Sequence, residues 1–324
     1  MRATRRTFVG GAVASAGLGV AAPAIAQARV LRYGDVSPLP MSWPLYIADR
    51  KGFFRDEGLT VETVYTNSNP AVAQQTVAGS FDLGATTYES AVRAIVGEAP
   101  LRIHASLMRA FPYMVMSSPE IKSVADMRGK TVSLPLVKSL ITVFWNRWLV
   151  ESGMKVADVD QIYDPATPNR FAALKSKSVH AAVLSQPFDW VAMSEGFNKL
   201  LDLGARVRDY GFTAFVARPD WAASHGGELR GFLRAVSRAV PYLDDPAHRE
   251  ECAEILMGPT KMSRENALRS WDYYVGELRP FDKSLDLPSR QLELLVGTLI
   301  EMGDFKRDGD YRPERFVDPS FLPV

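Results

Sequence analysis

The histidines and the cysteine are the side chains of this chain with the most reactive or metal-binding chemistry, and their spacing does not form a site. The four histidines are scattered singly, without metal-ligand spacing: His104, His180, His225 and His248. The single cysteine, Cys252, lies in a helix-like run, so a buried helical thiol is favoured over a reactive or metal-binding one. We find no nucleophile with an ordered base, no paired carboxylates in a shared motif and no phosphate loop. The pattern favours binding over catalysis and predicts no metal and no cofactor.

The N-terminus has the features of an export leader. Arg5 and Arg6 precede an uncharged, Ala- and Gly-rich run from Val9 to Ile25, and Ala24–Ala26 and Ala26–Ala28 are small-x-small cleavage sites. This pattern predicts a twin-arginine signal peptide over residues 1–28 and a periplasmic protein. Since no lipobox cysteine follows, we expect no lipid anchor. An uncleaved anchor or a flexible basic tail is the alternative.

Composition excludes some partners. The chain has a net charge of +1, with 47% hydrophobic and 23% charged residues. It therefore lacks the excess of positive charge expected of a protein that binds nucleic acid or a strongly anionic surface. Residues 29–324 suffice for two lobes at about 150 residues per domain. A small ligand is the better expectation.

From residue 30 onward, short strand-like runs alternate with helical ones. This alternation predicts an α/β fold with largely parallel sheets. One βα lobe is complete near Met108, a second follows, and the chain after Asp220 is helical. We predict chain crossings near Phe111 and Gly211, so that residues 29–111 and 213–324 form lobe I and residues 112–212 form lobe II. Two lobes joined in this way enclose a cleft, and ligands of open α/β sheets bind beyond the carboxyl ends of the strands.

Four segments carry a family resemblance. Leu45–Glu62 (LYIADRKGFFRDEGLTVE), Val77–Gly84 (VAGSFDLG), Ile121–Val132 (IKSVADMRGKTV) and Gln186–Phe188 (QPF) resemble, in order, blocks of extracytoplasmic solute-binding proteins. These serve ABC importers of sulfonates, taurine, nitrate and thiamine precursors. The resemblance implies a two-lobed type II periplasmic binding protein fold: mixed β-sheets flanked by helices, two hinge crossings and a helical C-terminal tail. It also implies a cognate ABC permease as partner and a monomeric state.

The chain departs from the family pattern at two places. The family usually has Gly at Lys177 or Ser178 and Asp at His180, so the turn there must be built differently. Gln186 stands where the family has Glu, which would change charge preference if this position faces the ligand.

The resemblance also implies where ligand contacts lie, namely in loops between strand ends and helix starts. Carried over by position, the candidates are Ser37, Trp43, Asn67, Ser68, Asn69, Thr86, Thr87, Tyr88, Lys138, Ser139, Gln186, Phe188, Tyr210 and Phe212. Helix N-termini there favour an anion or a carbonyl, and their hydroxyls add donors, although simple N-capping explains the same residues. Of the charged candidates near the cleft, Lys138, Arg109 and Glu89, Lys138 is the expected anion partner.

Aromatic side chains are frequent in these loops, which suits a flat ring and indicates an aromatic or heterocyclic anionic solute. Packing in the core is the favoured alternative for Phe111, Trp145, Trp148 and Trp190. We therefore predict a receptor that closes on its ligand. An exported enzyme, or a relative of the thiamine-pyrimidine synthases of this fold, is the second hypothesis.

Overall fold

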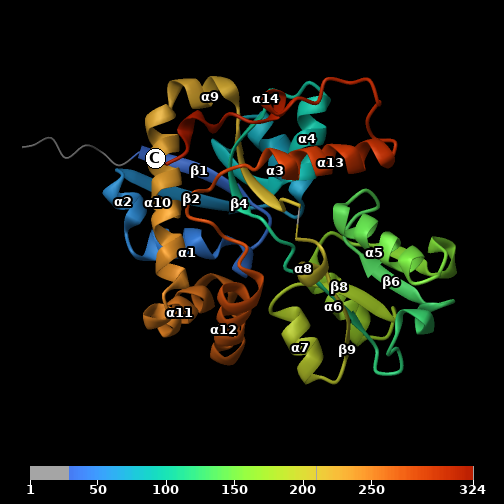
Figure 1. Cartoon of the computed structure of the whole chain (residues 1–324). Coiled ribbons are helices and arrows are strands. Elements are labelled where there is room, and N and C mark those ends of the chain that lie inside the picture. The colour runs from blue at the N-terminus through green and yellow to red at the C-terminus, as the bar shows by residue number, and fades with distance from the viewer. Residues whose placement is uncertain (1–28, 209, 324) are drawn as a thin grey trace, which may run out of the picture.

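The computed structural model describes residues 29–208 and 210–323, which form two α/β lobes (Figure 1). The predicted leader, residues 1–28, lies outside the described residues. Each lobe is built on one five-stranded sheet. We call the lobe with the sheet β2-β1-β3-β10-β4 the first lobe and the lobe with β7-β6-β8-β5-β9 the second lobe.

The sheets are mixed. The first contains β1 (Arg29–Asp35), β2 (Leu59–Tyr65), β3 (Leu83–Thr87), β4 (Arg102–Met108) and β10 (Thr213–Ala217). The second contains β5 (Met114–Ser117), β6 (Thr131–Leu134), β7 (Asp160–Tyr163), β8 (Ala181–Leu184) and β9 (Asn198–Asp202). The pairs β1–β2, β1–β3, β6–β7 and β6–β8 are parallel, whereas β10 and β5 run antiparallel to both of their neighbours.

The sequence predicted largely parallel sheets, and this was only partly right because each sheet contains one strand that runs antiparallel to both of its neighbours. A parallel neighbour needs a crossover connection, usually a helix. Strands β5 and β10 instead enter their sheets directly from the two crossings between lobes. The crossings touch each other: the Phe111 and Phe212 rings lie 4.8 Å apart, and the Phe212 N–H donates to the Met108 carbonyl at 2.9 Å.

The helices cover the sheets and form the C-terminal third. In chain order they are α1 (Trp43–Arg50), α2 (Phe53–Asp56), α3 (Asn69–Val77), α4 (Tyr88–Val96), α5 (Leu140–Glu151), α6 (Thr167–Lys175), α7 (Phe188–Ser194), α8 (Leu203–Arg206), α9 (Pro219–Ser224), α10 (Gly226–Asp244), α11 (Arg249–Thr260), α12 (Arg264–Trp271), α13 (Ser289–Glu301) and α14 (Pro313–Phe316), with a π-helical segment at Asp272–Leu278. In the described part, no helix has the length and apolar run needed to cross a bilayer.

The helical tail packs mainly on the first lobe. On α10, apolar residues recur at helical spacing, and Phe232 inserts between Phe54, Tyr33 and Phe215, with ring centroids 5.2–5.7 Å away. Trp43 on α1 donates from Nε1 to the Cys252 carbonyl of α11 at 3.0 Å. The Cys252 side chain is buried, which confirms a packing role for this thiol.

Local turn chemistry was partly readable from the sequence. Gly52 and Gly58 adopt φ of 76° and 72°, the region that glycine favours. At residues 177–180, where the chain departs from the family pattern, Lys177 takes the positive φ of 62° that a glycine would take more easily. The His180 ring stands where the family has Asp, and its Nδ1 accepts a hydrogen bond from the Thr131 N–H at 3.2 Å. The Asn69-Pro70 pair predicts Asn69 as the N-cap of α3, but the structure places the cap one residue earlier, at Ser68. Strand β9 was not predicted.

Candidate functional site

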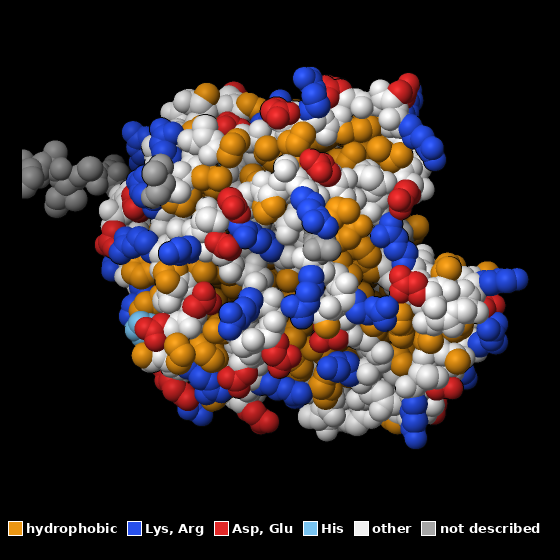
Figure 2. All heavy atoms as spheres, viewed as in Figure 1, with side chains coloured by type: hydrophobic (Ala, Val, Ile, Leu, Met, Phe, Trp, Pro, Cys, Tyr) orange, Lys and Arg blue, Asp and Glu red, His pale blue; other side chains and the backbone are white. Residues whose placement is uncertain are grey.

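A cavity of about 420 Å³ lies between the two lobes and receives residues from both. Its walls are mainly loops that follow the carboxyl ends of parallel strands: Val36–Ser42 after β1, Thr66–Pro70 after β2, Pro135–Ser139 after β6 and Pro165–Pro168 after β7. This is where open α/β sheets place ligands. At the side of this region the molecular outline is indented between α13 and α5 (Figure 2).

Four helix starts border the cavity. Ser68 Oγ accepts from the Ala71 N–H at 3.4 Å to cap α3, and Ser139 Oγ accepts from the Thr142 N–H at 3.2 Å to cap α5. Thr87 is the N-cap residue of α4, but its Oγ1 donates to Ser90 Oγ instead. The first turn of α6 also lines the cavity, through Thr167 and Pro168. Because a helix start carries unpaired peptide N–H groups and a partial positive charge, these starts favour an anionic or carbonyl group in the cavity.

Eight of the predicted contact residues line this cavity, and six lie elsewhere. The eight are Ser37, Asn67, Ser68, Asn69, Thr87, Lys138, Ser139 and Phe212. Of the six, Trp43, Thr86 and Tyr88 are buried in the first lobe, and Gln186 is buried in the second. Phe188 packs beside Phe171, and Tyr210 Oη shares a hydrogen bond of 2.9 Å with Thr298 Oγ1.

Thr86 and Gln186, two of the six residues outside the cavity, make hydrogen bonds within their own lobes. Thr86 Oγ1 donates to the Asn69 carbonyl at 2.8 Å, and Gln186 Nε2 donates to Asp189 Oδ2 at 2.6 Å. Phe111, Trp145 and Trp190 are buried and do not line the cavity, which confirms the core alternative for these three, whereas Trp148 is half-buried. Arg109 pairs with Asp282 at 2.8 Å, away from the cavity.

Two buried polar atoms among the lining residues have no hydrogen-bond partner in the described part of the chain. They are Glu89 Oε2 and Thr213 Oγ1. Glu89 is only 5% exposed, and burial raises the pKa of its carboxyl, an effect that Arg93 partly offsets. Burying a polar group without a hydrogen-bond partner costs free energy. A ligand that supplies the missing partner removes this cost and therefore binds more tightly.

A charged network crosses the cavity mouth between the lobes. Arg93 on α4 donates to Asp304 at 2.8 Å and to the Lys138 carbonyl of the second lobe at 2.7 Å. The Lys138 ammonium also pairs with Asp304. Although burial would raise the pKa of Asp304, hydrogen bonds from Lys138 and Arg93 hold it below its usual range. Lys138 therefore already has an anionic partner from the protein.

Sequence reasoning missed Asp35, Arg93, Thr213 and the Pro165–Pro168 loop as lining residues. The loop follows a predicted strand, so its position after the strand's carboxyl end was an available signal. Arg93 and Thr213 sit inside a helix and a strand, and nothing in their local sequence marks them.

Two α/β lobes with two crossings and a cavity between them define the type II periplasmic binding protein fold. The family model described as "NMT1/THI5 like" matches residues 40–248, and the chain belongs to this family. None of the curated proteins searched matches the sequence at a significant level.

Solved structures share the fold at low identity. The ligand-binding component of an ABC-type import system from Staphylococcus aureus, with zinc bound, has a TM-score of 0.75 and 17% identity, covering 90% of this chain and 97% of that one. The periplasmic nitrate-binding protein from Synechocystis PCC 6803 has a TM-score of 0.74 and 18% identity, and the match covers 90% of this chain and 86% of that one. The alkanesulfonate-binding protein from Xanthomonas axonopodis pv. citri, bound to MOPS, has a TM-score of 0.70 and 17% identity, and the match covers 85% of this chain and 92% of that one.

Among residues 29–208 and 210–323, no group of three or more His, Cys, Asp and Glu side chains is arranged to hold a metal ion.

Proposed function

We propose that this protein is the substrate-binding receptor of an ABC importer, and that the cavity between the lobes holds the solute. The observation that supports this most directly is a cavity of about 420 Å³ whose walls come from both lobes, so that closure buries whatever lies in it. The fold neighbours are import-system binding proteins, which agrees with this proposal. The moving bodies are residues 29–111 with 213–324, and residues 112–212.

The cavity walls support a ligand with an aromatic or heterocyclic body. Leu39, Met41, Leu107, Tyr113, Ile141 and Phe212 supply apolar and aromatic surface. Such a wall buries more area than a nitrate- or taurine-sized solute needs. The anionic or carbonyl group of the ligand lies at the helix starts of α3, α4 and α5, since Lys138 is already paired with Asp304.

Glu89 adds a second requirement. A simple anion would leave Glu89 Oε2 without a hydrogen-bond donor and would add a like charge near this buried carboxyl, which is unfavourable. The ligand we propose is therefore an aromatic or heterocyclic acid that also carries an N–H donor, with the donor directed at Glu89.

The proposal places the protein in the periplasm as a monomer, exported through the twin-arginine pathway without a lipid anchor. Its partners are the ligand and the cognate permease, with no catalysis and no cofactor. No contact in the described residues favours the alternative of an enzyme or a pyrimidine-synthase relative, so that alternative enters only as an outcome of the test.

The test is a thermal-shift screen of the purified protein against amino-substituted aromatic and heterocyclic acids, their unsubstituted parents, sulfonates, nitrate and pyrimidines, followed by calorimetry. We expect a saturable rise in Tm with an amino-substituted acid, recovered unchanged afterwards. Glu89→Gln should weaken its binding about 10- to 100-fold, because a charged hydrogen-bond partner is lost. The exposed Glu265→Gln should not.

Two results would overturn the proposal. A chemically altered compound would mean an enzyme, and the absence of any stabilising compound would remove the receptor assignment. A parent acid that binds as tightly as its amino derivative would exclude only the role given to Glu89.

A further inference from the structure

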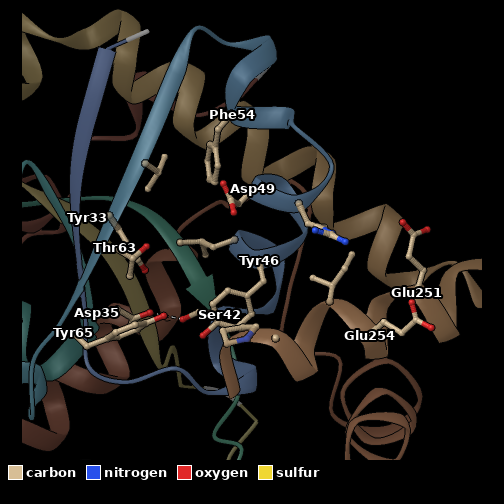
Figure 3. Close-up of a pocket in the computed structure, with 16 residues that line it drawn as sticks. Tyr33, Asp35, Ser42, Tyr46, Asp49, Phe54, Thr63, Tyr65, Glu251 and Glu254 are labelled. Carbon is tan, nitrogen blue, oxygen red and sulfur yellow. Dashed lines mark hydrogen bonds between the residues drawn. The ribbon is translucent and has the colours of Figure 1, made fainter. Parts of the chain in front are cut away.

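A second cavity, of about 540 Å³, lies within the first lobe (Figure 3). It is separate from the site proposed above, although Asp35 and Ser42 line both cavities. Its floor is the edge of the sheet formed by β1 and β2, and its other walls come from α1 and α11.

The strand period places the floor residues together. Tyr33 and Asp35 are two apart on β1, and Thr63 and Tyr65 are two apart on β2, so each pair points to one face. The parallel register sets Tyr33 beside Thr63 and Asp35 beside Tyr65. In Figure 3 these four side chains lie together on one side of the cavity.

The helical period builds the opposite wall. On α11, Glu251, Glu254, Ile255 and Gly258 recur at spacings of three and four, which puts them on one face of the helix. On α1, Leu45 and Asp49 are four apart and share a face with Tyr46 beside them. The cavity is thus a feature of two regular elements packed over a sheet edge.

The charge of the lining is negative. Four carboxylates, Asp35, Asp49, Glu251 and Glu254, line the cavity together with a single cationic residue, Arg50. Glu251 is compensated by Lys51, at 2.8 Å. Three carboxylates remain against one guanidinium, which favours a ligand of positive charge.

Four aromatic residues also line this negatively charged cavity, namely Tyr33, Tyr46, Tyr65 and Phe54. Aromatic faces attract organic ammonium ions, and small hard cations are instead bound by oxygen cages. Burial raises the pKa of the Tyr33 and Tyr46 hydroxyls, so these rings stay neutral.

Two buried groups in this cavity gain from a cation or donor. Tyr33 is 1% exposed, and its Oη has no partner among the described residues. Asp35 is 8% exposed; it accepts from Ser42 Oγ at 2.6 Å and from the Val36 N–H at 2.7 Å. These bonds come from neutral donors, and among the described residues no cationic side chain pairs with Asp35, so burial raises the pKa of its carboxyl to about 6.

We propose that the first-lobe cavity is a second binding site, and that it takes a small organic ammonium ion between its tyrosine rings and its carboxylates. This proposal does not depend on the function assigned to the cavity between the lobes.

The probe is choline, compared by calorimetry with 3,3-dimethyl-1-butanol, which has the same shape without the charge. We expect choline to bind and the alcohol not to bind. Tyr65→Leu should weaken choline binding about fivefold, because one ring face is lost. Asp49→Asn should weaken it by a similar factor and make it less sensitive to salt.

Both variants change exposed positions, and Asp308→Asn, another exposed change at a distance, is the matched control. Equal binding of choline and the alcohol would overturn the proposal. So would the absence of choline binding, or choline binding that neither Tyr65→Leu nor Asp49→Asn weakens, since the cation would then bind elsewhere.

Discussion

Asp189→Asn should stabilise the protein, and the gain should grow with pH. Asp189 is 0% exposed, and burial raises the pKa of its carboxyl from 3.8 to about 7. An acid with a raised pKa in the folded state opposes folding once it ionises. The penalty is absent below the unfolded pKa near 3.8, grows as the pH rises, and is complete above about 7.

The magnitude follows from the shift. About three pH units at roughly 1.4 kcal/mol each correspond to about 4 kcal/mol. At pH 5 only the interval from 3.8 to 5 counts, which gives about 1.6 kcal/mol. Asparagine carries no charge at either pH, so Asp189→Asn should gain about 3 kcal/mol more at pH 8 than at pH 5, which corresponds to the roughly two pH units between pH 5 and the folded pKa of about 7.

The site tolerates the amide. Asp189 Oδ1 accepts from the Trp190 N–H at 2.8 Å, a bond that the asparagine oxygen keeps. Asp189 Oδ2 accepts from Gln186 Nε2, and Gln186 Oε1 has no partner in the described residues. If the Gln186 amide turns over, its oxygen accepts from the new Asn nitrogen. The number of unpaired atoms therefore stays the same.

The assay is urea unfolding of both proteins at pH 5 and pH 8, with Asp308→Asn as the exposed control, expected to stay within about 0.5 kcal/mol. An equal effect of Asp189→Asn at the two pH values, or a loss at pH 8, would refute the account. Ligand affinity should be unchanged, because Gln186 and Asp189 do not line the cavity between the lobes.

Two further changes test other parts of the structure. Lys138→Met removes the ion pair with Asp304 that links the lobes. Since the Lys138 side chain is 69% exposed, losing this pair costs at most about 1 kcal/mol of binding free energy. Calorimetry should show ligand affinity falling up to about fivefold at low salt and less at high salt. A salt-independent loss would contradict a role for this pair. Lys177→Gly should raise the free energy of unfolding by about 0.5–1 kcal/mol, because Lys177 has φ 62°, and Lys177→Ala, which keeps a Cβ at that φ, should not.

Much of the fold was predictable because its signals are local. Alternation of strand and helix runs, proline and serine at the start of α3, and glycine at positive φ each depend on neighbours in the chain. Strand β9 was not predicted because Asn198–Asp202 is short and largely polar. This segment becomes a strand through its pairing with β5.

The site was predictable only where a residue's place in a loop decides its role. Ser68 and Ser139 follow strand ends and start helices, so their position at the cavity followed from order along the chain. Gln186 sits in an equivalent loop, but the tertiary structure turns it toward Asp189 and buries it. Lys138 lines the cavity, and its ammonium pairs with Asp304, a residue far away in sequence that reaches it across the lobes and that the sequence alone did not indicate.

The sequence by itself determined the order of strands and helices, the turns and caps between them, and family membership through short blocks of residues, because these depend on contacts between near neighbours. Only the tertiary structure decided which carboxylates are paired and which are not. Asp304 meets Lys138 and Arg93, while Glu89 Oε2 faces no partner among the described residues. These outcomes depend on residues from different lobes meeting in space, and charge and burial at such meeting points are set by packing rather than by local sequence.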